Sequence, residues 1–145
     1  MSHLNNNSIK INYNAAKENG IFNGDDDYVL YILINNDLNM DYGKIINFCC
    51  QSVYKVVKAN EGFDCNNNGY INWMANGEKI CIIKAKEEDL LYCINKYSDI
   101  NDDIWCQNIL DLGKTEISAF SLVCVAFTPI IKKNIPEFMK SLKEL

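Results

Sequence analysis

The chain contains no arginine, so all 14 of its cationic side chains are lysines, and no guanidinium fork is present to bind a phosphate bidentately. Its only histidine is His3, and its seven cysteines include no Cys-x-x-Cys pair, which gives a zinc site little support. No apolar run approaches the roughly 20 residues that a membrane-spanning helix needs. The net charge of −5 also lacks the basic surplus of most nucleic-acid-binding proteins.

What is present fits one folded domain. The 145 residues are 48% hydrophobic, which is enough to build a substantial core. The cysteines lie mostly inside apolar segments, a pattern that predicts buried, reduced thiols. The first 27 residues contain no apolar stretch typical of a secretory signal. We therefore expect a cytoplasmic protein.

The chain divides into two parts. Residues 1–27 are rich in asparagine and end in the acidic run 25–27, so we expect a flexible N-terminal extension. Residues 28–145 alternate between strand-like and helix-like hydrophobic spacing. The predicted elements of this part are a strand over 28–35, a helix over 43–60, a polar connection over 61–72, a strand over 78–85, a helix over 86–97, strands over 104–112 and 121–128, and a final helix that begins near Pro136 and ends at Leu145. This order predicts a single α/β domain with a small mixed β-sheet of about four strands and helices on both faces.

Two segments resemble ligand-binding motifs but lack a required residue. Residues 64–71 resemble the first half of a calcium loop, yet the position of the closing acid is Ala75, so we expect a surface turn. Residues 113–115 resemble the end of a phosphate-binding P-loop, but Asn108 stands where that motif needs glycine.

The candidate site lies where predicted strands end. Lys44 falls in the first turn of a helix, where partial positive charge and unpaired N–H groups already favour an anion. Asp111 ends a strand, Gly113 permits a tight turn, and Thr115 brings a hydroxyl back toward Asp111. If the first and third predicted strands are neighbours, Lys44 and Asp111 meet over their ends. The same residues are also compatible with a surface salt bridge and an ordinary hairpin turn.

Four stretches of this sequence, in this order, resemble the type-two peptidyl-tRNA hydrolase family. They are Asp37-Leu38-x-Met40-x-x-Gly43-Lys44, Trp73-x-x-x-Gly77-x-Lys79, Asp111-x-Gly113-Lys114-Thr115-x-Ile117, and Ser121 before an apolar strand that closes at Pro129. The resemblance covers roughly residues 28–145. It implies a small mixed sheet flanked by helices, commonly assembled as a homodimer.

The resemblance also implies a reaction. The family hydrolyses the ester that joins a peptide to tRNA, releasing peptide and free tRNA without a metal or another cofactor. By position, Lys44 would stabilise the oxyanion, Asp111 would orient or deprotonate the water, and Thr115 would supply a supporting hydroxyl. The substrate-binding residues that the resemblance implies are Gly43, Gly113, Lys114 and Ser121.

Several positions differ from the family's usual pattern. Four near the predicted site carry an apolar or amide residue in place of the usual one: Phe48, Gln51, Phe120 and Val123. Three more lack the usual Arg or Lys: Asn35, Asn39 and Tyr42. These differences leave two alternatives open. One is a catalytically inactive member of the scaffold that acts as a protein-binding or regulatory module, and the other is a hydrolase of a different small ester or amide.

The arrangement of the lysines is expected to discriminate between these functions. Convergence on one face would favour a nucleic-acid partner, and acids interspersed among the lysines would favour a binding module. The lysines in question are Lys44, Lys55, Lys58, Lys84 and Lys114.

Overall fold

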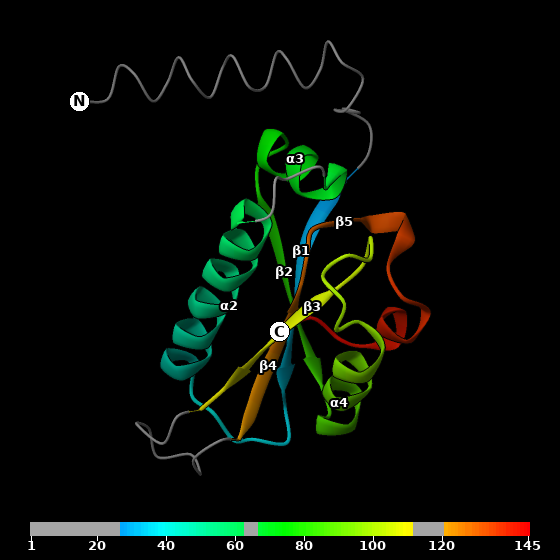
Figure 1. Cartoon of the computed structure of the whole chain (residues 1–145). Helices are drawn as coiled ribbons and strands as arrows, with labels where there is room; N and C mark the ends of the chain where they lie inside the picture. Colours follow the sequence, from blue (N-terminus) through cyan, green and yellow to red (C-terminus); the bar gives the residue numbers. More distant parts are fainter. Residues whose placement is uncertain (1–26, 63–66, 112–120) are drawn as a thin grey trace, which may run out of the picture.

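Strand β1 (Tyr28–Asn35) lies inside a five-stranded mixed sheet (Figure 1). The structure is a computed structural model that describes residues 27–62, 67–111 and 121–145. The predicted extension over residues 1–27 falls outside these residues apart from Asp27.

The sheet has the order β2-β1-β4-β3. β1 pairs in parallel with β2 (Lys79–Ala85) and antiparallel with β4 (Leu122–Phe127), and β4 pairs antiparallel with β3 (Cys106–Leu110). A short β5 (Ile130–Ile131) pairs antiparallel with the start of β1. The predicted α/β class and mixed sheet are confirmed, with five strands where about four were expected.

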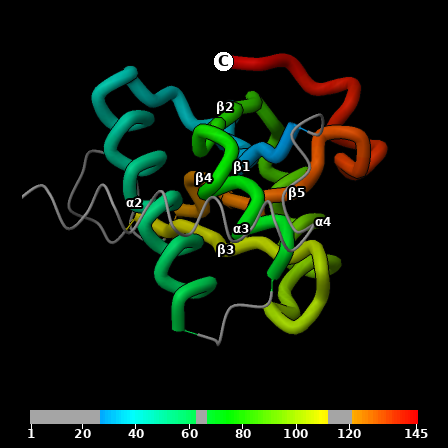
Figure 2. The backbone as a smooth tube through the Cα atoms, turned by 90° about the horizontal axis from the view of Figure 1, so that it is seen from above, coloured from blue at the N-terminus to red at the C-terminus, as the bar shows by residue number. Residues whose placement is uncertain are grey.

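The residues of β1 alternate between two hydrophobic cores. Leu30, Ile32 and Ile34 pack on the side of α2 (Tyr42–Gly62) and α3 (Asn68–Ala75). Val29, Tyr31 and Leu33 pack on the opposite side, with α4 (Glu87–Lys96) and the C-terminal segment. Figure 2 shows α2 and α4 on opposite sides of the sheet. The nearly continuous apolar sequence of β1 therefore reflects a strand that is covered on both faces.

Helix α2 confirms the helix predicted over residues 43–60. It begins where the Asp41 carboxylate accepts a hydrogen bond from the Lys44 backbone N–H at 2.9 Å, which satisfies one of the unpaired groups of the first turn. Its inward face is apolar and its outward face carries lysines, because the hydrophobic residues recur at helical spacing. No helix in the described part of the chain is both long and apolar enough to cross a bilayer.

Helix α3 corrects the prediction of a polar connection over 61–72. The Asn67 side chain accepts a hydrogen bond from the Tyr70 N–H at 3.0 Å and caps the helix. Gly69 lets the helix approach the carbonyl of Pro129 so closely that a Cβ at position 69 would clash with it. The helix was missed because its asparagines suggest a loop, whereas one of them is a cap.

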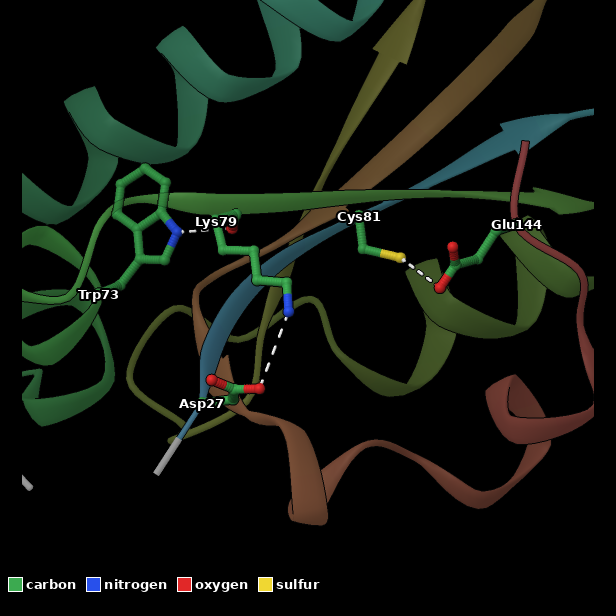
Figure 3. A network of polar contacts seen from close by, with 5 residues as sticks. All are labelled: Asp27, Trp73, Lys79, Cys81 and Glu144. Atoms are coloured by element: carbon green, nitrogen blue, oxygen red, sulfur yellow. Dashed lines mark hydrogen bonds and ion pairs between the residues drawn. The ribbon is translucent and has the colours of Figure 1, made fainter. Parts of the chain in front are cut away.

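The outer strand β2 is joined to its surroundings by the side chains in Figure 3. The Trp73 indole N–H donates to the Lys79 carbonyl at 2.7 Å, and the Lys79 ammonium lies 3.7 Å from the Asp27 carboxylate. The strand begins one residue later than predicted, since Glu78 has a positive φ of 55°.

The predicted C-terminal helix is wrong. After two short 3-10 helices, Lys132–Asn134 and Glu137–Ser141, the chain becomes extended. The Lys84 N–H donates to the Lys143 carbonyl at 2.8 Å, and the Leu145 N–H donates to the Ile82 carbonyl at 2.9 Å. These bonds satisfy backbone groups on the edge of β2 that a terminal helix would leave unpaired.

Most of the cysteine thiols in the described ranges are buried, as predicted. Cys49, Cys93, Cys106 and Cys124 are free and buried, whereas Cys50 is free and exposed. Burial raises the pKa of the Cys49 thiol to about 11 and raises the pKa of Cys93, Cys106 and Cys124 to about 12. These thiols are therefore protonated and unreactive at neutral pH.

The buried thiols predict a loss of stability at high pH. Above about pH 9 the unfolded chain releases thiol protons that the folded protein retains, so the free energy of unfolding falls as pH rises. Each such thiol contributes a slope of about 1.4 kcal/mol per pH unit between its unfolded and folded pKa values. Between pH 8 and pH 10, the free energy of unfolding measured in urea should therefore fall less for Cys93→Ala than for the wild type. Cys50→Ala is the matched control with an unchanged slope, and equal slopes in all three proteins would contradict the prediction.

Candidate active site

The C-terminal ends of β1 and β3 lie at the same edge of the sheet. Both strands run antiparallel to β4, so they are parallel to each other. The two strands are not direct neighbours, since β4 lies between them. The start of α2, which carries Lys44, and the end of β3, which leads into Asp111, are nevertheless both at the lower edge in Figure 1.

Helix α2 reaches this edge by crossing over β4 and β3. The Ser52 hydroxyl lies 3.0 Å from the Cys124 sulfur in β4, and the Lys55 ammonium donates to the Asn108 carbonyl in β3 at 3.4 Å. Lys44 lies two turns before Ser52, toward the end of β3. The helix therefore brings an ammonium and its own positively polarised N-terminus to the edge where Asp111 emerges.

Asp111 is almost completely buried, with 1% of its surface exposed. Its backbone N–H donates to the Ser121 carbonyl at 2.9 Å, which continues the pairing of β3 and β4 beyond Leu110. The structure therefore places two of the predicted site residues, Asp111 and Ser121, side by side. Every buried side-chain nitrogen or oxygen in the described ranges has a hydrogen-bond partner.

Of the remaining predicted site residues, the structure describes only Gly43. Gly113, Lys114 and Thr115 lie outside the described residues. Gly43 is exposed, and a Cβ there would make only an ordinary contact, 3.4 Å from the Asp41 carboxylate. The packing of the chain therefore does not itself require glycine at position 43.

A comparison with protein-family models identifies the family. The model of peptidyl-tRNA hydrolase PTH2 matches residues 28–145. The chain belongs to the peptidyl-tRNA hydrolase PTH2 family. No individual curated protein matches the sequence. The members of the PTH2 family are ester hydrolases of translation that act on peptidyl-tRNA, and the match covers every helix and strand of the described domain.

Two departures from the usual PTH2 pattern lie in the core. Phe48 is 3% exposed and Val123 is fully buried, and both belong to the hydrophobic cluster beneath α2. Their apolar side chains therefore fill the interior and give no support to a narrower, apolar pocket for another small ester. Phe120 lies outside the described residues, and Gln51 is exposed on α2.

Of the five lysines in question, the four that the structure describes form no single cluster in this PTH2 member. Lys55 and Lys58 line a groove of about 440 Å³ along α2 together with Gln51, Tyr54, Ala59 and Gln107. Lys44 lies at the start of the helix, near Asp41, and Lys84 lies on β2. The lysine criterion therefore favours only the α2 groove as a surface for nucleic acid. In the described ranges, no group of three His, Cys, Asp or Glu side chains could hold a metal ion.

Sequence reasoning missed a polar junction at the same edge. The Asn35 side chain bonds to Leu122 and to Asp37, and the Asp37 carboxylate accepts from the Glu87 N–H at 2.9 Å. Asn35, which stands where the family usually has Arg or Lys, is fully buried. The available signal was its place at the end of a strand that is apolar on both faces.

The role of Gly43 in substrate binding remains a prediction, and it has a direct test. Gly43→Ala should leave the protein equally stable or more stable, because alanine is favoured in a helix by up to about 1 kcal/mol. If substrate approaches the backbone here, the added methyl should lower kcat/KM for peptidyl-tRNA about tenfold, a loss of about 1.4 kcal/mol of transition-state stabilisation. Gly62→Ala, at the other end of α2 with open space around its Cβ, is the matched control. Full activity of Gly43→Ala would remove Gly43 from the site.

Proposed function

We propose that this chain hydrolyses the ester bond of peptidyl-tRNA, releasing the peptide and free tRNA. The observation that carries the proposal is the position of Lys44 and Asp111 at one edge of a PTH2-family fold, on segments that are 67 residues apart (111 − 44). Peptidyl-tRNA arises during translation, so the proposal implies a cytoplasmic protein. The homodimer implied by the family resemblance stays a prediction.

In the proposed reaction, water attacks the carbonyl carbon of the ester. Asp111 orients this water and accepts its proton, and the Lys44 ammonium stabilises the negative charge that develops on the carbonyl oxygen. The bond between the carbonyl carbon and the ribose oxygen then breaks. The proton passes from Asp111 to the leaving ribose oxygen, so the products are a peptide carboxylic acid and a tRNA hydroxyl. Thr115 would hold the water or Asp111.

The described geometry supports these roles in two ways. The N-terminus of α2 adds its partial positive charge to that of the Lys44 ammonium, and both act on the same oxyanion. Asp111 is buried and its backbone is fixed to Ser121, so its carboxylate is held in place before substrate binds. Preorganised groups of this kind reduce the reorganisation that the reaction itself requires.

The groove along α2 supports an RNA partner. Tyr54 is 66% exposed, and the Lys58 ammonium lies 5.8 Å from the centre of its ring. An exposed aromatic ring stacks with a nucleotide base, and neighbouring lysines bind phosphates. We therefore assign the groove to the RNA part of the substrate, since Lys55 lies about three helical turns from Lys44 and the catalytic edge.

Removal of either catalytic group should abolish most activity while the fold persists. We expect Lys44→Ala and Asp111→Asn each to lower kcat on peptidyl-tRNA by a factor of about 10² to 10⁴, since each loses a group that acts in the transition state. Circular dichroism checks the fold, and Lys140→Ala, whose ammonium forms an exposed pair with Glu137, is the matched control. Near-normal turnover of both variants would refute the catalytic assignment. An inactive wild type would instead favour the binding-module alternative.

The α2 groove should determine the salt dependence of tRNA binding. For the double variant Lys55→Gln/Lys58→Gln, the slope of log affinity against log salt should become shallower by about 0.7 to 0.9 for each lost phosphate contact. The turnover of saturating substrate should stay the same. Lys132→Gln/Lys133→Gln changes charge equally on another part of the surface and should leave the slope unaltered. An unchanged slope in the α2 variant would show that RNA does not bind this groove.

A further inference from the structure

Asn35 occupies an unusual place at the catalytic edge. It is the last residue of β1 and is fully buried, although it carries a polar side chain. A buried amide is tolerated only when its donor and its acceptor are both paired. Its two partners therefore show what this side chain does.

The two ends of the Asn35 amide bond to different parts of the edge. Its nitrogen donates to the Leu122 carbonyl at the start of β4 at 2.8 Å. Its oxygen accepts from the Asp37 N–H at 3.0 Å, in the loop that leads to α2. The opposite amide orientation would set oxygen against oxygen and N–H against N–H, so the donor and acceptor are fixed by their surroundings.

These bonds connect the loop before α2 to β4, the strand that pairs with β3 directly before Asp111. The register of β1 with β4 ends at Ile34, so the Asn35 side chain extends that connection by one residue beyond the backbone ladder. Leu122 is the partner of Leu110 in β3, directly before Asp111. On its other side, Asp37 lies in the loop between β1 and α2, the helix that carries Lys44 in its first turn.

We propose that Asn35 is a positioning residue for hydrolysis, which holds the loop before α2 and Lys44 in a fixed position relative to the strand end at Asp111 through its side-chain amide. The proposal rests on the proposed function. Asn35 touches neither substrate nor the reacting atoms in this scheme, so its effect is exerted through the segments that it joins. A displacement of about 1 Å between catalytic groups costs up to about 100-fold in rate.

The variant Asn35→Asp tests the amide with almost no change in shape. At pH 8 its carboxylate would keep the acceptor for Asp37 but would face the Leu122 carbonyl without a proton. We expect kcat to fall about 10- to 100-fold while KM stays within about twofold. At pH 5 to 6 a buried carboxyl takes up a proton more readily than an exposed one and regains the donor. The ratio of variant to wild-type kcat should therefore recover as the pH is lowered.

Asn60→Asp is the matched control. Asn60 is also buried, and its amide donates to the Val56 carbonyl at 3.0 Å and to the Thr128 hydroxyl at 3.3 Å. Thr128 follows the far end of β4, at the opposite edge of the sheet. This variant should lose thermal stability to a similar extent while retaining kcat within about twofold at every pH. If both variants lose kcat in proportion to stability, Asn35 has only a structural role and the proposal is overturned.

Hydrogen exchange provides a readout that does not need activity. In Asn35→Asp at pH 8, the variant loses the bond to the Leu122 carbonyl, so the amide proton of Asp111, which is bonded to the neighbouring Ser121 carbonyl, should exchange faster, while that of Leu30 in the centre of β1 should not. Unchanged exchange at Asp111 would overturn the proposed connection even in an active enzyme. A wild type without hydrolase activity would overturn the proposed function and with it the catalytic part of this inference, and exchange would then show whether the connection exists.

Discussion

The antiparallel strand β4 is the constraint on which the candidate site depends. It separates β1 from β3, and because it opposes both, it makes their C-terminal ends point the same way. A helix that follows β1 and a carboxylate that follows β3 then share one edge without any direct pairing between those two strands. The buried cores on both faces hold this arrangement, since neither β1 nor β4 has a face in contact with water. The chemistry of the edge is therefore a consequence of strand direction and of burial on two sides.

Much of the fold could be predicted from the sequence because hydrophobic spacing reports burial directly. The apolar run of β1 indicated a strand covered on both faces, and the helical spacing of Ile45, Cys49 and Val56 matches the buried face of α2. The candidate site residues could be proposed because strand ends and helix starts collect polar chemistry in α/β proteins. The catalytic assignments of Lys44 and Asp111 stay predictions, although the structure places both at one edge.

The parts that could not be predicted depend on contacts between distant segments. The insertion of β4 between β1 and β3 determines which strands pair, and the spacing of residues along the chain does not encode it. Helix α3 depends on Asn67 as a cap and on the close approach of Gly69 to Pro129. The burial of Asn35 could not be predicted, because it arises only when β1, β4 and the loop after β1 assemble.

The C-terminal segment has a consequence for the association of this protein with other copies of itself. An outer strand with free N–H and C=O groups is a template for additional strands, including those of aggregating molecules. Here Lys143 and Leu145 bond to Lys84 and Ile82, so part of the β2 border is already occupied from within the same molecule. The few residues after the last 3-10 helix therefore oppose the addition of strands from other molecules to β2, the edge strand farthest from β3.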